Sequence, residues 1–228
     1  MKAVLFDLYG TLIDIHTDEE STKFWNKISK ITQKYHKYNP IELKEKYITI
    51  CKEKSLVREE IDILEVFEEL LFISKEQATQ IAWAFRKAST KYIHLYKGVK
   101  KLLKRLKNEG VCLYVLSNAQ EAFTIPELKK LRIESLFDGI AISSSYGVKK
   151  PNVEFFKGAI DDFGIQGEIW MIGNDADCDI HPAKELGLRT IFIESNLTPF
   201  NEEEDKMIGF QFKQIFNTIL GINLGNQN

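Results

Sequence analysis

The amino-acid sequence predicts an α/β protein in which a doubly wound parallel sheet carries a small all-helical insert. Short apolar runs of strand length alternate with segments of helical periodicity, which is typical of parallel sheets with right-handed crossovers. The stretch over residues 14–96 differs, because it has helical patterns and few strand-like runs. A chain of 228 residues has room for one large domain, or for a core domain with such an insert.

The first predicted strand is the apolar run Ala3-Val4-Leu5-Phe6, which ends abruptly in Asp7. A continuous apolar run indicates a strand that is buried on both faces. Asp7 then lies at the carboxyl end of a strand, where open α/β sheets bind their ligands. Gly10 provides the tight turn that leads the chain out of the sheet, and Thr11 follows it. An isolated aspartate at such a position usually caps a loop. A functional role for Asp7 therefore depends on the residues that follow the later strands.

The predicted insert contains four helices. The first begins near Ser21, and the second begins at Pro40, because proline is favoured in the first turn of a helix. The third carries an apolar stripe over residues 61–71. Ser74 and Gln77 form a predicted capping box ahead of the fourth. These apolar stripes predict core packing rather than contacts with a cofactor.

Strands and helices alternate again after residue 97. The predicted strands cover residues 111–116, 139–143, 169–173 and 190–193. The predicted helices cover residues 99–109, 125–131, 155–160, 179–186 and 203–220. Because all the carboxyl ends of parallel strands meet on one rim of the sheet, polar residues that follow the strands are expected to gather there.

Composition and charge exclude several classes of protein. The formal net charge is −2, which offers no electrostatic footprint for nucleic acid. No apolar run approaches the length that spans a membrane, and the N-terminus shows no signal-peptide pattern, so we expect a cytoplasmic protein. The three cysteines are widely separated, and we expect them to be reduced thiols.

The residues at the strand ends form a set that suits the transfer of a phosphoryl group. The set comprises Asp7, Thr11, Ser117, Asn118, Lys150, Asp175 and Asp179. Acidic side chains beside a nucleophilic carboxylate are costly unless a cation binds among them, and oxygen ligands next to a phosphate suit Mg²⁺. The lysine and the hydroxyls would hold a phosphoryl group while Asp7 attacks its phosphorus atom. Taken singly, the same residues are also typical of turns and helix caps.

The stretch Phe6-Asp7-Leu8-Tyr9-Gly10-Thr11-Leu12 resembles the first motif of the haloacid dehalogenase-like hydrolases. The resemblance covers nearly the whole chain up to about Asn196. It continues in order through Leu116-Ser117-Asn118, Lys149-Lys150-Pro151 and Gly173-Asn174-Asp175-Ala176-Asp177-Cys178-Asp179. It implies a Rossmann-like core over residues 1–13 and 97–228, with a small helical cap over residues 14–96.

The resemblance also implies an activity, namely Mg²⁺-dependent hydrolysis of a small phosphorylated metabolite. Asp7 would be the nucleophile and would form an aspartyl-phosphate intermediate. The implied catalytic residues are Asp7, Thr11, Ser117, Asn118 and Lys150. The implied metal ligands are Asp7, the backbone carbonyl of Tyr9, Asn174, Asp175 and Asp179.

Tyr9 departs from the family pattern, because family phosphatases usually have an aspartate there as the general acid and base. A tyrosine at this position resembles the 2-haloacid dehalogenases, in which the aspartate attacks carbon and no metal is used. The rest of that pattern is poorly met, since Phe156 and Ala176 stand where those enzymes have tyrosine and asparagine. A dehalogenase is therefore the second interpretation. The third is a weakly active or inactive protein that binds a phosphate-bearing ligand or a protein partner.

Three residues that closely follow the first motif are candidate replacements for the missing proton donor: Asp14, His16 and Asp18. A second departure is Asn174, which stands where a metal-binding aspartate is common. Asp175 has the Asp-x3-Asp spacing to Asp179 that the family also uses, whereas Asn174 offers a neutral carbonyl oxygen. Both remain candidate ligands.

Overall fold

The computed structural model describes residues 1–199 and 206–222 of the chain. Within these residues the main sheet has six strands in the order β5-β4-β1-β6-β7-β8, and every neighbouring pair is parallel. The strands are β1 (Lys2–Phe6), β4 (Cys112–Ser117), β5 (Gly139–Ile142), β6 (Glu168–Gly173), β7 (Arg189–Glu194) and β8 (Lys206–Ile208). The predicted parallel sheet is confirmed.

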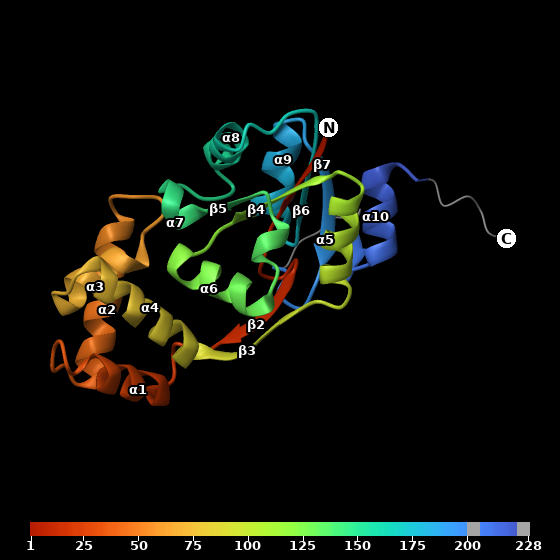
Figure 1. The fold of residues 1–228 in the computed structure, drawn as a ribbon. Coiled ribbons are helices and arrows are strands. Elements are labelled where there is room, and N and C mark those ends of the chain that lie inside the picture. Colours follow the sequence, from red (N-terminus) through yellow and green to blue (C-terminus); the bar gives the residue numbers. More distant parts are fainter. Residues whose placement is uncertain (200–205, 223–228) are drawn as a thin grey trace.

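Strand β1 lies in the interior of this sheet, and its residues alternate between two hydrophobic layers. Val4 and Phe6 belong to the layer that includes α5 (Val99–Asn108) and α10 (Phe212–Leu220). Ala3 and Leu5 pack in the layer that includes α8 (Val153–Asp162) and α9 (His181–Glu185). Figure 1 shows the strands between these two pairs of helices. Because helices cover both faces, β1 needs apolar residues at every inner position.

Three helical segments begin close to the carboxyl ends of the central strands. Helix α6 (Glu121–Leu131) follows β4, α7 (Ser143–Tyr146) follows β5, and the π-helical turn η2 (Ala176–Ile180) follows β6. A short 3₁₀ turn, η1 (Glu134–Leu136), connects α6 to β5. The loops between these strands and helices therefore lie on one rim of the sheet.

Four helices form a bundle with a hydrophobic cluster of its own. They are α1 (Thr22–Thr32), α2 (Pro40–Ser55), α3 (Ile63–Leu71) and α4 (Lys75–Ser89), and we call them the α1–α4 bundle. Phe24, Trp25, Phe67 and Phe85 are at most 4% exposed and make edge or tilted ring contacts. The predicted capping box is confirmed, because the Ser74 and Gln77 side chains each bind the backbone of the other residue.

The two ends of the predicted insert differ from expectation, because they are strands. β2 (Ile13–Thr17) and β3 (Thr90–Leu95) form a two-stranded antiparallel ribbon, with Ile13 opposite Leu95 and Thr17 opposite Thr90. Figure 1 shows this ribbon leading from the sheet to the α1–α4 bundle. Residues 14–96 are thus helical only between the strands of this ribbon.

The C-terminal part also differs from expectation. The prediction of one helix over residues 203–220 is corrected, because residues 206–208 form β8 beside β7 and the helix begins only at Phe212. Gly209 adopts a φ of 66° between the two elements, so the helix does not extend back into β8. Residues 203–205 lie outside the described part. None of the described helices has both the length and the hydropathy needed to cross a bilayer.

Candidate active site

The candidate residues come together on the rim where the central strands end. Asp7 follows β1, Ser117 ends β4 and Asn174 follows β6 directly. Because β1 lies between β4 and β6, these three residues are brought to adjacent strand ends. Lys150 reaches the same place from the loop between α7 and α8.

Lys150 is the centre of the site's hydrogen bonding. Its side chain is 2% exposed, and its Nζ lies 2.8 Å from Asp7 Oδ1 and 2.6 Å from Asp179 Oδ1. It also donates to the Leu116 carbonyl at 2.9 Å. Burial alone would lower the pKa of Lys150, but Asp179 and Asp7 reverse that effect and raise it. The lysine is therefore a fixed cation that holds two carboxylates.

Thr11 holds the other oxygen of the nucleophile candidate. Its hydroxyl lies 3.1 Å from Asp7 Oδ2 and 3.2 Å from Asn174 Oδ1, so one O–H group faces both acceptors. Gly10 allows this approach, because a Cβ there would lie 2.1 Å from the Asn174 amide nitrogen. Its φ of 90° also favours glycine.

Asp179 is 1% exposed and fully engaged. Its Oδ2 accepts the backbone N–H groups of Asn174 and Asp175, each at 3.1 Å, while its Oδ1 binds Lys150. Burial raises the pKa of Asp179, and the neighbouring Lys150 opposes that rise. A Cβ at Gly173 would lie 2.2 Å from Asp179 Oδ2, so the side chain fits only beside a glycine.

Asp175 and Asn174 have different surroundings, although the sequence left both as possible ligands. Asp175 Oδ1 accepts the N–H groups of Asp177 at 3.0 Å and Cys178 at 2.9 Å, which caps the turn η2. Asn174 is 4% exposed, and its carbonyl oxygen lies 3.2 Å from the same Thr11 hydroxyl that faces Asp7. The structure thus brings Asn174, rather than the Asp175 side chain, to the nucleophile candidate.

Ser117 has the feature most suggestive of a missing ligand. Its hydroxyl is the one buried side-chain polar atom without a hydrogen-bond partner among the residues that the structure describes. A buried hydroxyl without a partner is costly, and it fits a site where an anion's oxygen would complete the bond. Asn118, the next residue, instead binds the backbone of Lys150.

The donor set fits a hard cation, although its carboxylates do not form a cage. Across residues 1–199 and 206–222, no three histidine, cysteine, aspartate or glutamate side chains converge as a metal-binding group. Mg²⁺ needs only one or two carboxylates, because it keeps several waters and binds substrate phosphate. Asp7 Oδ2 and Asn174 Oδ1, which face one hydroxyl, are oxygen donors of that type.

The Tyr9 side chain is hydrogen-bonded to helix α6. Its phenol donates to Glu127 Oε2 at 2.5 Å and lies 3.1 Å from Thr124 Oγ1, and both partners belong to α6. Arg86 of α4 donates through Nε to Glu127 Oε1 at 2.6 Å. Burial and the nearby Glu127 raise the pKa of Tyr9 well above its usual range. Tyr9 is therefore held as a hydrogen-bond donor to Glu127.

Sequence reasoning missed Glu127, Thr124 and Arg86 altogether. The available signal was a charged residue among the buried positions of a helix, because Glu127 is flanked by the buried Phe123, Thr124 and Leu128. A glutamate in such a place needs a cation or a proton donor. The partner, however, comes from a helix about 40 residues earlier, and no local pattern in the sequence links the two.

The three candidate proton donors have partners of their own. Asp14 accepts Asn196 Nδ2 at 3.0 Å and lies 3.3 Å from His94 Nε2, and His16 stacks on Tyr92. Asp18 pairs with Lys91 at 3.1 Å, and it also accepts the Ser21 N–H at the start of α1. None of the hydrogen bonds or ion pairs found among the described residues joins these side chains to Asp7.

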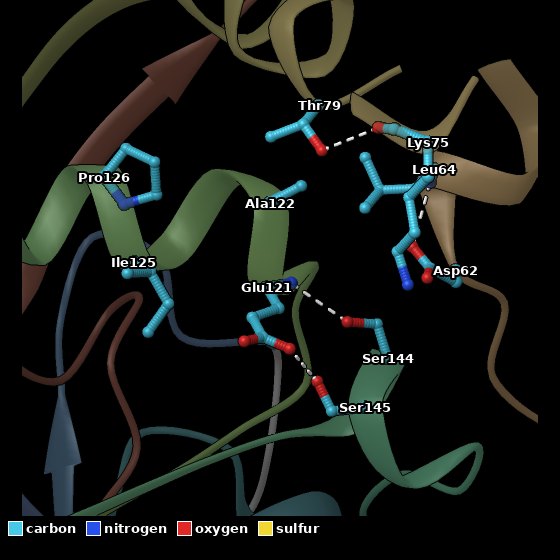
Figure 2. A pocket seen from close by; sticks show the side chains of 10 residues that line it. All are labelled: Asp62, Leu64, Lys75, Thr79, Glu121, Ala122, Ile125, Pro126, Ser144 and Ser145. Carbon is cyan, nitrogen blue, oxygen red and sulfur yellow. Dashed lines mark hydrogen bonds between the residues drawn. The ribbon is translucent and has the colours of Figure 1, made fainter. Parts of the chain in front are cut away.

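A cleft of about 550 Å³ lies between the α1–α4 bundle and the helices α6 and α7. Figure 2 shows Lys75 and Thr79 on the bundle side, facing Glu121 and Ile125 of α6. None of Asp7, Ser117 and Lys150 lines this cleft. The cleft is therefore separate from the cluster around Asp7.

Solved structures with this fold include enzymes of two kinds. A crystal structure of a HAD phosphatase from Thermococcus onnurineus matches with a TM-score of 0.63 and 21% identity, and the match covers 97% of this chain and 98% of that one. A 2-haloacid dehalogenase from Pseudomonas syringae pv. Tomato matches with a TM-score of 0.66 and 17% identity, covering 97% and 98%. At these identities the likeness shows the fold alone.

Sequence comparison adds a curated relative and a family. A glyceraldehyde 3-phosphate phosphatase from Pyrococcus furiosus is 29% identical over 112 residues, which are 49% of this chain and 47% of the relative. The matched part thus spans about half of that relative's length. The family model of the haloacid dehalogenase-like hydrolases matches residues 1–187. The chain therefore belongs to the haloacid dehalogenase-like hydrolases.

Proposed function

We propose that the protein is a Mg²⁺-dependent phosphatase that acts on a small phosphorylated metabolite through an aspartyl-phosphate on Asp7. One arrangement carries this proposal. The Asp7 carboxylate is held between Lys150 and Thr11, and the neighbouring strand ends in the buried Ser117 hydroxyl that lacks a partner. A nucleophile beside a lysine, two hydroxyls and a neutral amide oxygen suits phosphoryl transfer, in which positioning and charge neutralisation dominate.

The charge of the cluster supports the need for a cation. Asp7 and Asp179 share Lys150, so two carboxyl groups face a single ammonium group in a buried site. A phosphoryl dianion would be repelled by that arrangement unless positive charge is added. Mg²⁺ would be bound by Asp7, Asn174 and the Tyr9 carbonyl, with Asp175 and Asp179 as the further candidate ligands. It would neutralise the negative charge of the phosphoryl oxygens during transfer.

The chain's own residues then have distinct roles. An Asp7 oxygen attacks phosphorus in line, so a phosphorus–oxygen bond forms on Asp7 while the bond to the leaving alkoxide breaks, and the alkoxide takes its proton from water. Ser117 and Thr11 donate hydrogen bonds to the phosphoryl oxygens, and Lys150, whose ammonium group already donates to Asp7, Asp179 and the Leu116 carbonyl, offsets their negative charge. Water then attacks phosphorus, releases inorganic phosphate and regenerates the Asp7 carboxylate. Asn118 acts by holding the backbone of Lys150.

We also propose the division of labour within the chain. Residues 1–13 and 97–228 would form the core that carries the chemistry, and residues 14–96 would form the cap that selects the substrate. The name of the Pyrococcus furiosus relative makes three-carbon phosphoesters the first substrates to test. The reaction would take place in the cytoplasm, as the sequence analysis expects, and cell fractionation would test this location.

A metal-independent 2-haloacid dehalogenase is the second candidate, because a tyrosine stands two residues after Asp7. The phenol of Tyr9 is bound to Glu127, however, so this tyrosine is not free to contact a substrate beside Asp7. The third candidate, a weakly active or inactive phospho-ligand-binding protein, rests on the missing aspartate at position 9.

The deciding experiment is a screen of small phosphomonoesters and 2-haloacids, each with Mg²⁺ and with EDTA. We expect phosphate release that requires Mg²⁺ and that disappears in Asp7→Asn, since an amide cannot act as the carboxylate nucleophile. Halide release in EDTA would identify a dehalogenase instead. Phosphate binding by Asp7→Asn and the unmodified protein, without turnover in either, would favour the ligand-binding protein.

A further inference from the structure

Glu127 connects two parts of the molecule that are far apart in the sequence. One oxygen, Oε2, accepts the phenol of Tyr9 at 2.5 Å, and the other, Oε1, accepts Nε of Arg86 at 2.6 Å. Tyr9 lies two residues after Asp7, whereas Arg86 lies on α4 of the α1–α4 bundle. A single carboxylate of α6 thus holds the nucleophile loop and the bundle together.

The three side chains are packed as well as hydrogen-bonded. The Arg86 guanidinium lies 5.6 Å from the Tyr9 ring centre and 5.3 Å from that of Phe123, so it covers both rings. Glu127 is 2% exposed and Arg86 is 13% exposed. Removing the cation from a buried ion pair leaves an uncompensated charge, which is strongly unfavourable. Movement of α4 away from α6 would therefore disturb the carboxylate that holds Tyr9.

A shift of Tyr9 would be transmitted to the nucleophile. The loop after Asp7 is a tight turn in which the Leu8 carbonyl accepts the N–H groups of Thr11, Leu12 and Ile13. Thr11 in turn donates to Asp7. Tyr9 lies inside this turn, so its anchoring limits where both Asp7 and Thr11 can lie.

Helix α4 contacts α6 near its C-terminal end and borders a cleft near its N-terminal end. Near the C-terminal end of α4, Arg86 binds Glu127 and the Phe85 ring stacks on Phe123 at 6.4 Å. Near its N-terminal end, Lys75 and Thr79 line the 550 Å³ cleft in front of α6. Figure 2 shows Lys75 and Thr79 among the residues that line this cleft. The contact through Glu127 is thus a local attachment between the bundle and α6.

We propose that Glu127 is a positioning residue that couples the placement of the α1–α4 bundle to the order of the Asp7–Thr11 loop. This proposal rests on the proposed function in one respect, because the Asp7–Thr11 loop matters to turnover only if Asp7 is the nucleophile. When Arg86 is docked, Glu127 holds Tyr9 and the loop is ordered. When Arg86 is withdrawn, the same loop loosens although no residue of it has changed.

The test measures the loop in the resting protein, without substrate. Amide hydrogen exchange is followed for residues 10–13 in the unmodified protein, Arg86→Met, Arg86→Lys, Glu127→Gln and Tyr9→Phe. We expect exchange in Arg86→Met and Glu127→Gln to be about tenfold faster in this loop, since its amides are protected by the turn. Arg86→Lys, which keeps the cation, should restore most of the protection.

A matched control removes a guanidinium from an aromatic ring elsewhere. Arg105 of α5 lies 4.3 Å from the Phe216 ring centre of α10, and Arg105→Met should leave exchange in residues 10–13 unchanged. If Arg86→Met also leaves the loop's exchange unchanged, the coupling does not exist. If it accelerates exchange equally throughout the molecule, Arg86 is merely a stabilising residue, and the proposal is again overturned.

Turnover gives a second readout. For Arg86→Met and Glu127→Gln we expect kcat to fall about 10–100-fold, because small displacements of reacting groups are costly, while KM changes by less than about threefold. A large rise in KM with an unchanged kcat would mean that Arg86 binds substrate instead, and it would overturn the proposal. If the unmodified protein hydrolyses no phosphoester, the proposed function fails, whereas the exchange comparison still decides the coupling.

Discussion

Asn118 and Lys150 hold each other by two hydrogen bonds of equal length. The Lys150 N–H donates to Asn118 Oδ1 at 2.8 Å, and Asn118 Nδ2 donates to the Lys150 carbonyl at 2.8 Å. Because Asn118 follows β4 directly, this pair fixes the Lys150 loop to the end of a central strand. The ammonium group that binds Asp7 is thereby positioned from both its side chain and its backbone.

The first prediction concerns this pair. Asn118→Ala removes both hydrogen bonds, so the free energy of unfolding should fall by about 1–3 kcal/mol. Turnover should fall as well, because Lys150 is no longer fixed beside Asp7. Urea denaturation and steady-state kinetics measure the two effects. Asn39 is a matched control, since its side chain also makes two hydrogen bonds to the backbone, both accepted from N–H groups at the start of α2. Asn39→Ala should lower the free energy of unfolding by about 0.5–2 kcal/mol and leave turnover unchanged.

The second prediction concerns the cation. Asn174→Asp should tighten Mg²⁺ binding about tenfold, since affinity rises with the charge of the oxygen ligands. Asn174→Ala should weaken it, whereas Asp175→Ala should mainly destabilise the turn η2 that Asp175 caps. Mg²⁺ titration by calorimetry compares the three variants. Weaker binding in Asp175→Ala than in Asn174→Ala would instead support the Asp-x3-Asp spacing as the ligand pattern.

The third prediction concerns the leaving group. Tyr9 donates its proton to Glu127, and burial raises the pKa of its phenol, so it is poorly placed and a weak acid toward a departing alkoxide. General acid catalysis typically contributes about 10²–10⁴-fold, and alkyl phosphates need it more than aryl phosphates do. The kcat/KM values should therefore fall steeply as the pKa of the leaving group rises. A flat dependence would point to another donor, and Asp14→Asn, His16→Gln and Asp18→Asn would then identify it.

The fourth prediction separates two effects of a methyl group on a glycine. Gly173→Ala places a Cβ 2.2 Å from Asp179 Oδ2, so it should displace Asp179 and abolish most turnover. Gly110 has a φ of 75°, and a Cβ added to it would have no neighbour within 4 Å among the described residues, so Gly110→Ala meets only backbone strain. That strain should cost about 1–2 kcal/mol and leave the specific activity of the folded protein unchanged. Equal losses of turnover in both variants would show that crowding at Asp179 is not the cause.

Much of the candidate site on the rim of the sheet was predictable because the relevant signals are local. A buried strand produces a short apolar run, and the residue after it reaches the rim by geometry alone. The positions of Asp7 and Ser117 on the rim were predicted in this way, whereas Asn174 was a candidate only through the family resemblance. Lys150 was found through its motif, and the structure adds that one ammonium group binds both Asp7 and Asp179.

The features that escaped prediction depend on pairings between distant segments. β2 and β3 are short, and each becomes a strand because it pairs with the other. The whole α1–α4 bundle separates the two strands in the sequence. Glu127 and Arg86 are likewise ordinary helix residues one at a time, and only the packing of α4 on α6 joins them. β8 is three residues long and follows a stretch without a strong apolar pattern. Such contacts are set by tertiary structure rather than by local preference.

The β2–β3 ribbon has a consequence for how the chain tolerates insertions. Thr17 and Thr90 are partners in the ribbon, so the segment between them leaves and returns at nearly the same point. For such a closed loop, the entropy of closure grows only with the logarithm of its length, by about 0.6 kcal/mol for each doubling. The sheet is therefore almost indifferent to how many residues emerge from the ribbon, and a bundle of another size could replace this one at little entropic cost to the sheet.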